Sequence, residues 1–228
     1  MLYVISSPIG SIEEVSLQAV KTLVSSDIIL CEDTRTFIPF YKKTCGLFQL
    51  APKKDQKIVQ FYKDREFQEL PNIIKYLESE MVVSLITEAG TPLVSDPGRL
   101  LVETCQKRNT SYTSVPGSSS VVNAGVLSGC RFQNFLFIGF LPKKITQVEK
   151  QIGQYREISK KLKHLEICFF ESPKRINKTL ESINNIIPDS NVCICKEMNK
   201  RFEEIIIDKP KNLLSRSYKG ELTVVLKL

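Results

Sequence analysis

A loop rich in glycine and proline is the feature that most constrains the fold of this chain. It is the segment Thr87-Glu-Ala-Gly-Thr-Pro-Leu-Val-Ser-Asp-Pro-Gly98, which follows directly on an apolar run at residues 81–86. A buried strand that ends in such a loop delivers exposed main chain to the carboxyl edge of a sheet, where open α/β folds bind ligands. Its glycines let a ligand approach the main chain, and Thr91, Ser95 and Asp96 offer hydrogen-bond partners. The loop therefore predicts a ligand site, with an ordinary connecting turn as the alternative.

A second loop of this kind opens the chain. The apolar run at residues 2–5 leads into Ser6-Ser-Pro-Ile-Gly10 and then into a segment that we expect to be a helix beginning at Ser11, because Glu14 follows at capping-box spacing. The loop has neither the G-x-G-x-x-G nor the G-x-x-x-x-G-K-[ST] pattern of phosphate-binding loops. It favours a ligand that is held by main chain and hydroxyl groups.

A third apolar run, at residues 27–31, ends in Glu32-Asp-Thr-Arg35. Helical segments separate the three runs, and this order predicts parallel strands. Parallel strands would bring all three polar loops to the same edge of one sheet. The alternative for the charged loop is a solvated turn.

The second half of the chain predicts a mixed sheet with helices. Strands are expected at residues 135–140, 166–170, 191–196, 204–207 and 221–226, and a one-sided helix within residues 143–163. Pro173 is expected to start a helix after the second of these strands. The sequence thus predicts an α/β chain with an N-terminal, mostly parallel sheet at residues 1–114 and a C-terminal mixed sheet at residues 115–228.

Composition narrows the class of protein. The chain has 32 Lys and Arg against 25 Asp and Glu, a formal charge of +7, and several lysine pairs, which favours attraction to phosphate. Seven cysteines without a C-x-x-C pair indicate reduced structural thiols and no metal site. No apolar run approaches the roughly 18 residues of a membrane span, so we expect no membrane association and a cytoplasmic location.

Seven motifs follow one another along the chain. They are Ser7-Pro-Ile-Gly-Ser11, Cys31-Glu-Asp-Thr-Arg35, Ala89-Gly-Thr-Pro-Leu-Val-Ser-Asp-Pro-Gly98, Val115-Pro-Gly117, Gly139-Phe-Leu-Pro-Lys-Lys144, Phe170-Glu-Ser-Pro-Lys-Arg175 and Lys196-Glu-Met-Asn-Lys-Arg-Phe-Glu-Glu-Ile205. In this order they resemble the motifs of the RsmI family, within the tetrapyrrole methylase superfamily. The resemblance implies a two-domain tetrapyrrole-methylase-like fold. It also implies an S-adenosylmethionine-dependent methyltransferase that acts, as a homodimer, on a ribose 2′-hydroxyl of a decoding-site cytidine of 16S ribosomal RNA in the small subunit. The C-terminal domain would complete the cofactor cleft.

The resemblance also assigns site residues. Glu32 and Asp33 are alternative proton acceptors, and Arg35 would hold phosphate or orient one of them. The cofactor would be held, without a metal, by Pro8, Gly10, Glu88, Ala89, Gly90, Thr91, Pro92, Gly117, Ser118, Ser119 and Glu171.

The chain departs from the family pattern at identifiable places. Glu88 stands where the family usually has Asp, and residues 61–66 contain no histidine, which excludes a histidine base there. The sequence ends at Leu228, where many members continue with a helical tail, so we expect any RNA contact made by that tail to be missing or replaced. Two alternatives stay open: methyl transfer to a tetrapyrrole, and a non-catalytic assembly factor that binds ribosomal RNA.

Overall fold

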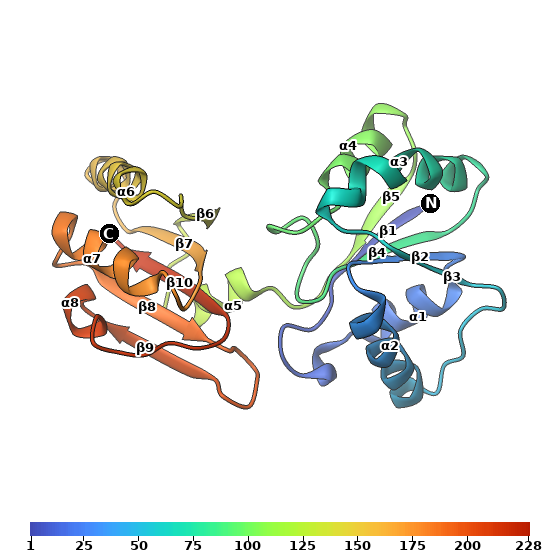
Figure 1. Cartoon of the computed structure of the whole chain (residues 1–228), viewed down its shortest axis with the longest axis horizontal. Helices are drawn as coiled ribbons and strands as arrows, with labels where there is room; N and C mark the ends of the chain where they lie inside the picture. Colours follow the sequence, from blue (N-terminus) through green and yellow to red (C-terminus); the bar gives the residue numbers. More distant parts are fainter. The chain divides into compact units, whose positions relative to one another are not determined.

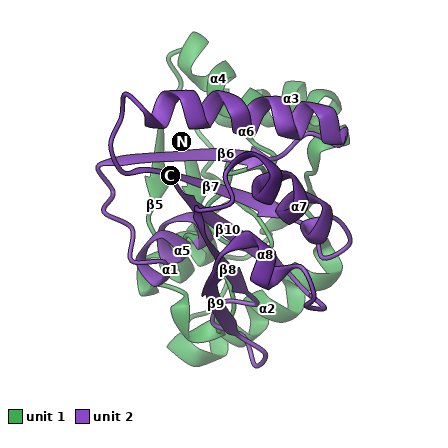
Figure 2. Cartoon of the chain, turned by 90° about the vertical axis from the view of Figure 1, so that its left-hand side faces the viewer, with its two compact units in different colours: residues 1–119 green, residues 120–228 purple.

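The computed structural model describes residues 1–228 and divides them into two compact units (Figures 1 and 2). Unit 1 comprises Met1–Ser119 and unit 2 comprises Ser120–Leu228. The sequence predicts domains at residues 1–114 and 115–228 and gives each a part in the function. This functional division stays a prediction.

Unit 1 contains a parallel five-stranded sheet in the order β3-β2-β4-β1-β5. Its strands are β1 (Leu2–Ile5), β2 (Ile28–Cys31), β3 (Lys57–Gln60), β4 (Val83–Ile86) and β5 (Tyr112–Val115). The last residues of the strands are in register, because Ile86 pairs with Ile5 and Cys31, and Ile5 pairs with Val115. The loops that follow β1, β2, β4 and β5 therefore leave the same edge, which confirms the parallel arrangement expected from the sequence.

Helices cover both faces of this sheet, as a fully buried parallel sheet requires. Helices α3 (Lys63–Glu78) and α4 (Arg99–Lys107) lie on one face, and α1 (Leu17–Ser25) and α2 (Thr34–Phe48) lie on the other (Figure 1). Alternate strand residues feed the two cores: Leu30 and Leu85 pack with α3 and α4, while Ile29 and Ile86 pack with α1 and α2.

The first helix begins later than the sequence predicts. Ser11 does form a capping box with Glu14, but the box caps only the short 3-10 helix η1 (Ile12–Glu14). The chain then becomes extended at Val15, and α1 begins at Leu17 with Ser16 as its N-cap. The prediction of a continuous helix from Ser11 was therefore wrong, because two capping serines five residues apart each start a separate turn.

Unit 2 contains a mixed five-stranded sheet in the order β6-β7-β10-β8-β9. Its strands are β6 (Asn134–Phe140), β7 (Leu165–Glu171), β8 (Asn191–Lys196), β9 (Glu204–Asp208) and β10 (Leu222–Lys227). Only β6 and β7 are parallel, and the other neighbours are antiparallel. The mixed sheet confirms the expectation for this half of the chain.

The core of unit 2 lies between one face of its sheet and three helices. Helices α6 (Ile145–Ser159), α7 (Ile176–Ile186) and α8 (Pro210–Leu213) contribute to this core, together with strand residues such as Phe169 and Val224. The remaining helix is α5 (Ser120–Leu127), which contacts β7, β8 and β10.

All seven cysteines carry free thiols. No helix in the chain is both long and apolar enough to cross a bilayer.

A buried glutamate fixes the end of the long loop that follows β4. The loop ends at Gly98, which is the N-cap of α4 and has no side chain to cap it. Glu66 of α3, only 9% exposed, accepts a hydrogen bond from the Leu101 amide at 3.1 Å. A carboxylate at a helix N-terminus satisfies an otherwise unpaired amide and interacts favourably with the helix dipole.

We expect Glu66→Ala to destabilise unit 1 by about 1–2 kcal/mol, because the Leu101 amide loses its buried acceptor. Urea unfolding measures the change, and hydrogen exchange at the Leu101 amide should become faster. Glu69→Ala, on the same helix, is the matched control and should change stability by less than about 0.5 kcal/mol. Equal effects of the two substitutions would contradict the capping role.

Candidate active site at the edge of the parallel sheet

Three loops at the carboxyl edge of the unit 1 sheet are joined by hydrogen bonds. The Ser7 amide donates to the Gly90 carbonyl at 2.9 Å, and the Gly90 amide donates to the Pro8 carbonyl at 3.3 Å. The hydroxyls of Ser6 and Thr91 lie 3.0 Å apart, and the Thr91 hydroxyl donates to the Ser118 carbonyl at 3.2 Å. Loops whose bonded residues lie 27 to 85 positions apart in the sequence thus form one surface.

Two glycines allow this close approach. A Cβ atom on Gly117 would lie 2.8 Å from the Ser6 Cβ, so no larger residue fits there without movement. Gly90 has a φ of +80°, a conformation that strains other residues. Ala89 and Pro92 belong to the same turn as Gly90, and Ser119 follows Ser118 as the last residue of the unit. The structure therefore brings the expected binding residues of the three loops together.

Next to these loops lies a small pocket of about 100 Å³. Acidic, hydroxyl and aromatic side chains share its wall, and the lining residues are Ser7, Cys31, Glu32, Asp33, Thr36, Phe37, Phe40, Thr87 and Glu88. Three of the expected site residues, Glu32, Asp33 and Glu88, meet here. Thr36 and the two phenylalanines were not singled out from the sequence, because only the fold shows that α2 lies beside the end of β4. Thr87 belongs to the predicted loop, but the sequence assigned it no role of its own.

Asp33 is already paired within its own loop. It is the N-cap of α2 and accepts from the Arg35 amide at 2.8 Å, and its second oxygen lies 2.6 Å from the Arg35 guanidinium. The hydrogen bond from the Arg35 side chain holds the pKa of Asp33 below its usual value. Asp33 is consequently a poor proton acceptor. The guanidinium that it orients is 87% exposed and free to meet an anion.

Glu32 and Glu88 both line the pocket and are joined by hydrogen bonds of their loops. The Glu88 amide donates to Glu32 Oε1 at 3.0 Å, and the Thr36 hydroxyl donates to Glu88 Oε1 at 2.9 Å. Partial burial raises the pKa of Glu32, and the charge of Glu88 adds to the shift. Thr87 lines the same pocket, and its hydroxyl is buried and has no hydrogen-bond partner. An unpartnered buried hydroxyl is rare in folded proteins and marks a place where a bound group can supply the missing bond.

Asp96, in the long loop after β4, has the most perturbed carboxyl group near this edge. Burial raises its pKa to about 7, and the negative charge of Glu32 contributes to the rise. From the sequence, Asp96 was only a hydrogen-bond partner in a polar loop. Its strong perturbation depends on burial and on Glu32, which belongs to another loop, so the sequence alone does not reveal it.

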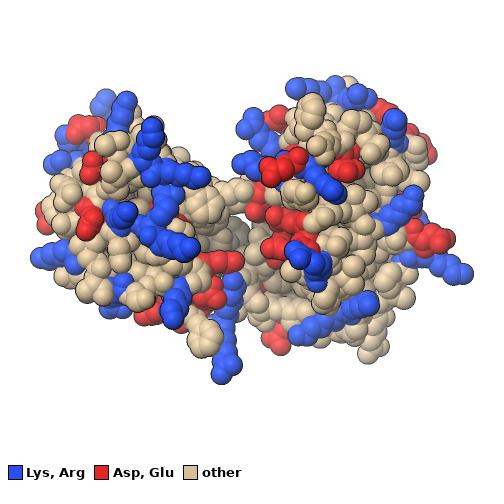
Figure 3. Space-filling view, viewed as in Figure 1, with Lys and Arg blue, Asp and Glu red and all other residues tan.

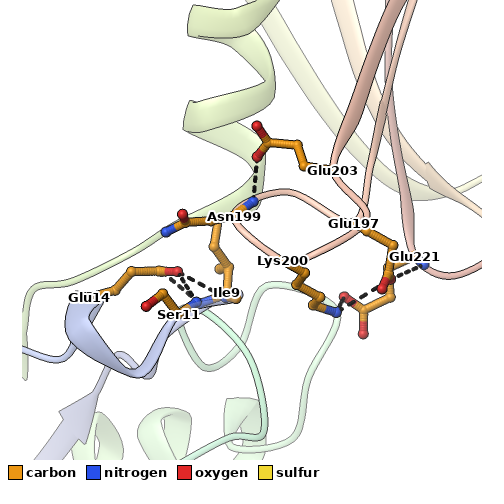
Figure 4. A network of polar contacts seen from close by, with 9 residues as sticks. Ile9, Ser11, Glu14, Glu197, Asn199, Lys200, Glu203 and Glu221 are labelled. Carbon is orange, nitrogen blue, oxygen red and sulfur yellow. Dashed lines mark hydrogen bonds and ion pairs between the residues drawn. The ribbon is translucent and has the colours of Figure 1, made fainter.

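Glu14 shapes the first loop from outside. Its carboxylate accepts from the amides of Ile9 at 2.8 Å, Gly10 at 2.9 Å and Ser11 at 2.7 Å (Figure 4). The Gly10 amide, expected to face a cofactor, is therefore already bonded to Glu14. A carboxylate that accepts hydrogen bonds from three consecutive amides holds the loop in one conformation.

In unit 2, the expected binding residue Glu171 is fully enclosed by its own partners. Its carboxylate accepts from the Ser172 amide at 2.8 Å and the Thr179 hydroxyl at 2.7 Å, and Arg175 lies 3.4 Å away. These contacts tie the end of β7 to α7. The helix begins at Ile176 after the N-cap Arg175, so the prediction that Pro173 starts it was wrong, because residues 173–175 form a turn that places Arg175 beside Glu171.

A second polar network of unit 2 orders the turn between β8 and β9 (Figure 4). Lys200 pairs with Glu221 at 2.7 Å, and Glu197 accepts from the Glu221 amide at 2.8 Å. The turn presents the Arg201 guanidinium 5.5 Å from the centre of the exposed Phe202 ring.

On the face shown in Figure 3, basic side chains are spread over both units and acidic side chains gather over one part of unit 1.

Sequence comparisons identify relatives over nearly the whole chain. A family model described as Tetrapyrrole (Corrin/Porphyrin) Methylases matches residues 1–213. The chain is 36% identical over 232 residues to "Ribosomal RNA small subunit methyltransferase I" of Rickettsia prowazekii (strain Madrid E), covering 99% of this chain and 77% of the relative. It is 33% identical over 231 residues to the protein of the same name from Thermotoga maritima, covering 99% of this chain and 97% of the relative.

Solved structures share the fold at low identity. The methyltransferase CobJ has a TM-score of 0.71 at 14% identity, covering 99% of this chain and 92% of the other. Diphthine synthase has a TM-score of 0.70 at 15% identity, covering 99% of this chain and 88% of the other. These likenesses confirm the two-domain fold that the sequence motifs implied.

We expect Asp96 to lower stability as the pH rises. Below the ordinary pKa of 3.8, the carboxyl group is protonated in both the folded and the unfolded chain and costs nothing. Between 3.8 and about 7 the unfolded chain ionises first, so stability is lost, and above about 7 the full cost is present. Asp96→Asn cannot ionise, so its thermal midpoint should exceed that of the wild type at pH 8 and match it near pH 4. A difference that does not change between these two pH values would contradict the raised pKa.

Proposed function

Because the chain belongs to the tetrapyrrole methylase family and, within it, to the ribosomal RNA small subunit methyltransferase I group, we propose that it transfers a methyl group from S-adenosylmethionine to a ribose 2′-hydroxyl of a cytidine in 16S ribosomal RNA. The observation that carries this proposal is the extent of the likeness, which reaches 36% identity over 99% of the chain. The motifs that resemble the family lie on loops that the structure brings to one edge.

The joined loops of unit 1 suit S-adenosylmethionine. Gly90 presents main chain without a side chain, and a Cβ atom there would meet only Ile9 and the Ser118 carbonyl within 4 Å. We assign contact roles to Pro8, Ala89, Gly90, Thr91, Pro92, Gly117, Ser118 and Ser119. Glu88 contributes through its main chain, because its side chain lines the neighbouring pocket. Gly10 and Glu171, which have partners of their own, act by shaping the loop and the β7–α7 junction. The bound cofactor supplies an activated methyl group on a sulfonium, which needs no metal.

Asp96 is the residue that we propose as proton acceptor, ahead of Glu32 and Asp33. A ribose hydroxyl is a poor nucleophile, and a base whose pKa lies near the working pH is the most effective helper. Asp96 has a pKa of about 7, whereas the Asp33 carboxylate is paired with Arg35. Glu32 contributes by raising the Asp96 pKa, and the exposed Arg35 contacts an RNA phosphate. In-line alignment of the hydroxyl and the methyl group supplies much of the rate enhancement.

The finer features of the proposal concern the partner and the assembly. We propose that the substrate is the assembled small subunit, that two copies of the chain act as a homodimer with residues 115–228 completing the cofactor cleft, and that the protein works in the cytoplasm. The charge of +7 supports attraction to RNA, and a dimer would double the basic surface that faces it.

Methyl transfer from labelled S-adenosylmethionine to small subunits from cells that lack this protein tests the function. Label in 16S RNA that survives as a 2′-O-methylcytidine after nuclease digestion is the expected result. Label on a supplied tetrapyrrole would instead favour the wider chemistry of the family. Binding to the subunits without any transfer would favour the non-catalytic assembly factor.

The Gly90 turn gives a direct test of cofactor binding. We expect Gly90→Val to weaken S-adenosylmethionine binding at least tenfold, because the side chain would project where the ligand meets the main chain and would be strained at a φ of +80°. Calorimetry measures the affinity, and circular dichroism verifies folding. The matched control is Gly153→Val in α6, where a Cβ atom meets nothing within 4 Å. Normal binding by a folded Gly90→Val protein would count against this placement.

The proton acceptor gives a test through pH. The methylation rate at saturating substrate should rise with pH through about 7, since Asp96 accepts a proton only when ionised. Asp96→Asn should lower the rate by about 10²–10⁴-fold with little change in cofactor affinity. Glu32→Gln should move the midpoint of the profile to lower pH, because it removes the charge that raises the Asp96 pKa. An unchanged profile in Asp96→Asn would rule out this assignment.

A further inference from the structure

The pocket beside the cofactor loops combines acceptors, a donor and aromatic walls. Glu32 Oε1 and Glu88 Oε1 each accept one hydrogen bond from the protein, and the Oε2 atom of each remains available to a further donor. Phe37 and Phe40 form the apolar part of the wall, with ring centres 6.3 Å apart. A ligand that fits this wall has an apolar ring face and a polar edge that donates hydrogen bonds.

The Thr87 hydroxyl is an independent sign of a ligand. Thr87 is only 4% exposed, lines the pocket and leaves its Oγ1 without a partner. A buried hydroxyl that stays unbonded destabilises the folded chain, so a ligand that bonds to it gains affinity. A ligand atom that accepts a hydrogen bond would satisfy the Thr87 hydroxyl. A neighbouring ligand group that donates would bond to the carboxylates of Glu32 and Glu88. The ligand edge therefore carries a donor beside an acceptor.

Size restricts the ligand further. A cavity of about 150 Å³ holds a benzene ring, and the pocket measures about 100 Å³. It therefore has room for the edge of a six-membered ring and not for a whole ring.

We propose that this pocket reads the target base of the RNA, and that Glu88, with Glu32 and Thr87, selects cytosine over uracil. The cytosine amino group donates to Glu88 and Glu32, and its ring nitrogen N3 accepts from Thr87. Uracil places a carbonyl oxygen where cytosine has the amino group, and that oxygen would face two carboxylates. Enzymes that modify a nucleotide commonly read its base on this edge against aromatic side chains. The inference rests on the proposed function, which already names cytidine, and adds the residues that select its base.

Glu88→Gln tests the selection. The glutamine amide can still accept from Thr36 through its oxygen, and it offers a donor to the uracil carbonyl. We expect the ratio of methylation rates for small subunits with cytidine or uridine at the target position to fall on the order of tenfold or more. Thr87→Val, which removes the hydroxyl at constant shape, should raise the KM for the cytidine subunit severalfold and leave cofactor affinity unchanged. Glu78→Gln, an exposed glutamate paired with Arg108, is the matched control.

Titration with single nucleotides separates this inference from the proposed function. The wild-type protein should bind cytidine 5′-monophosphate more tightly than uridine 5′-monophosphate, and Glu88→Gln should reduce the cytidine preference. If the wild type methylates subunits but Glu88→Gln keeps the full preference for cytidine, the pocket does not read the base. If no subunit is methylated, the proposed function fails, and the titrations decide on the pocket alone.

Discussion

The in-register ends of the parallel strands in unit 1 determine where the candidate site lies. Ile5, Cys31, Ile86 and Val115 end their strands side by side, so the chain must release four loops at one edge. Because these loops leave together, a few main-chain and hydroxyl bonds are enough to join them into one surface. The strand register thus places the loops, and the loop residues supply the hydrogen-bonding groups of the site.

Three carboxylates near this edge have different environments and hence different abilities. Asp33 is tied to Arg35 and to the start of α2, which keeps it ionised. Glu32 is partly buried and bonded to the Glu88 amide, while Asp96 is held in a setting that favours its protonated form. One acidic edge can therefore orient an arginine, accept hydrogen bonds and take up a proton at separate positions.

The sequence predicted the parallel sheet, the shared edge and the loop residues, because hydrophobic runs followed by glycine and polar residues are local signals. It did not predict β3 or β5, the two edge strands of this sheet. The β3 segment Lys57-Ile-Val-Gln60 has only two apolar residues. The sequence also did not predict the Thr36–Glu88 contact or the environment of Asp96, since both join residues more than 50 positions apart. Such long-range pairs depend on how helices pack on the sheet, which no local pattern records.

The interior position of β1, between β4 and β5, has a consequence for the order of events during protein synthesis. The first strand to leave the ribosome lies between β4 and β5, so its partners are the segments Val83–Ile86 and Tyr112–Val115. The Ser6–Gly10 loop cannot be fixed by Gly90, Thr91 and Gly117 until those later segments have emerged. Pairing over such sequence distances makes sheet formation slow compared with helix formation. A nascent chain shorter than about unit 1 therefore exposes an unpaired apolar strand, and protection of that strand from aggregation becomes a task for the cell's folding machinery.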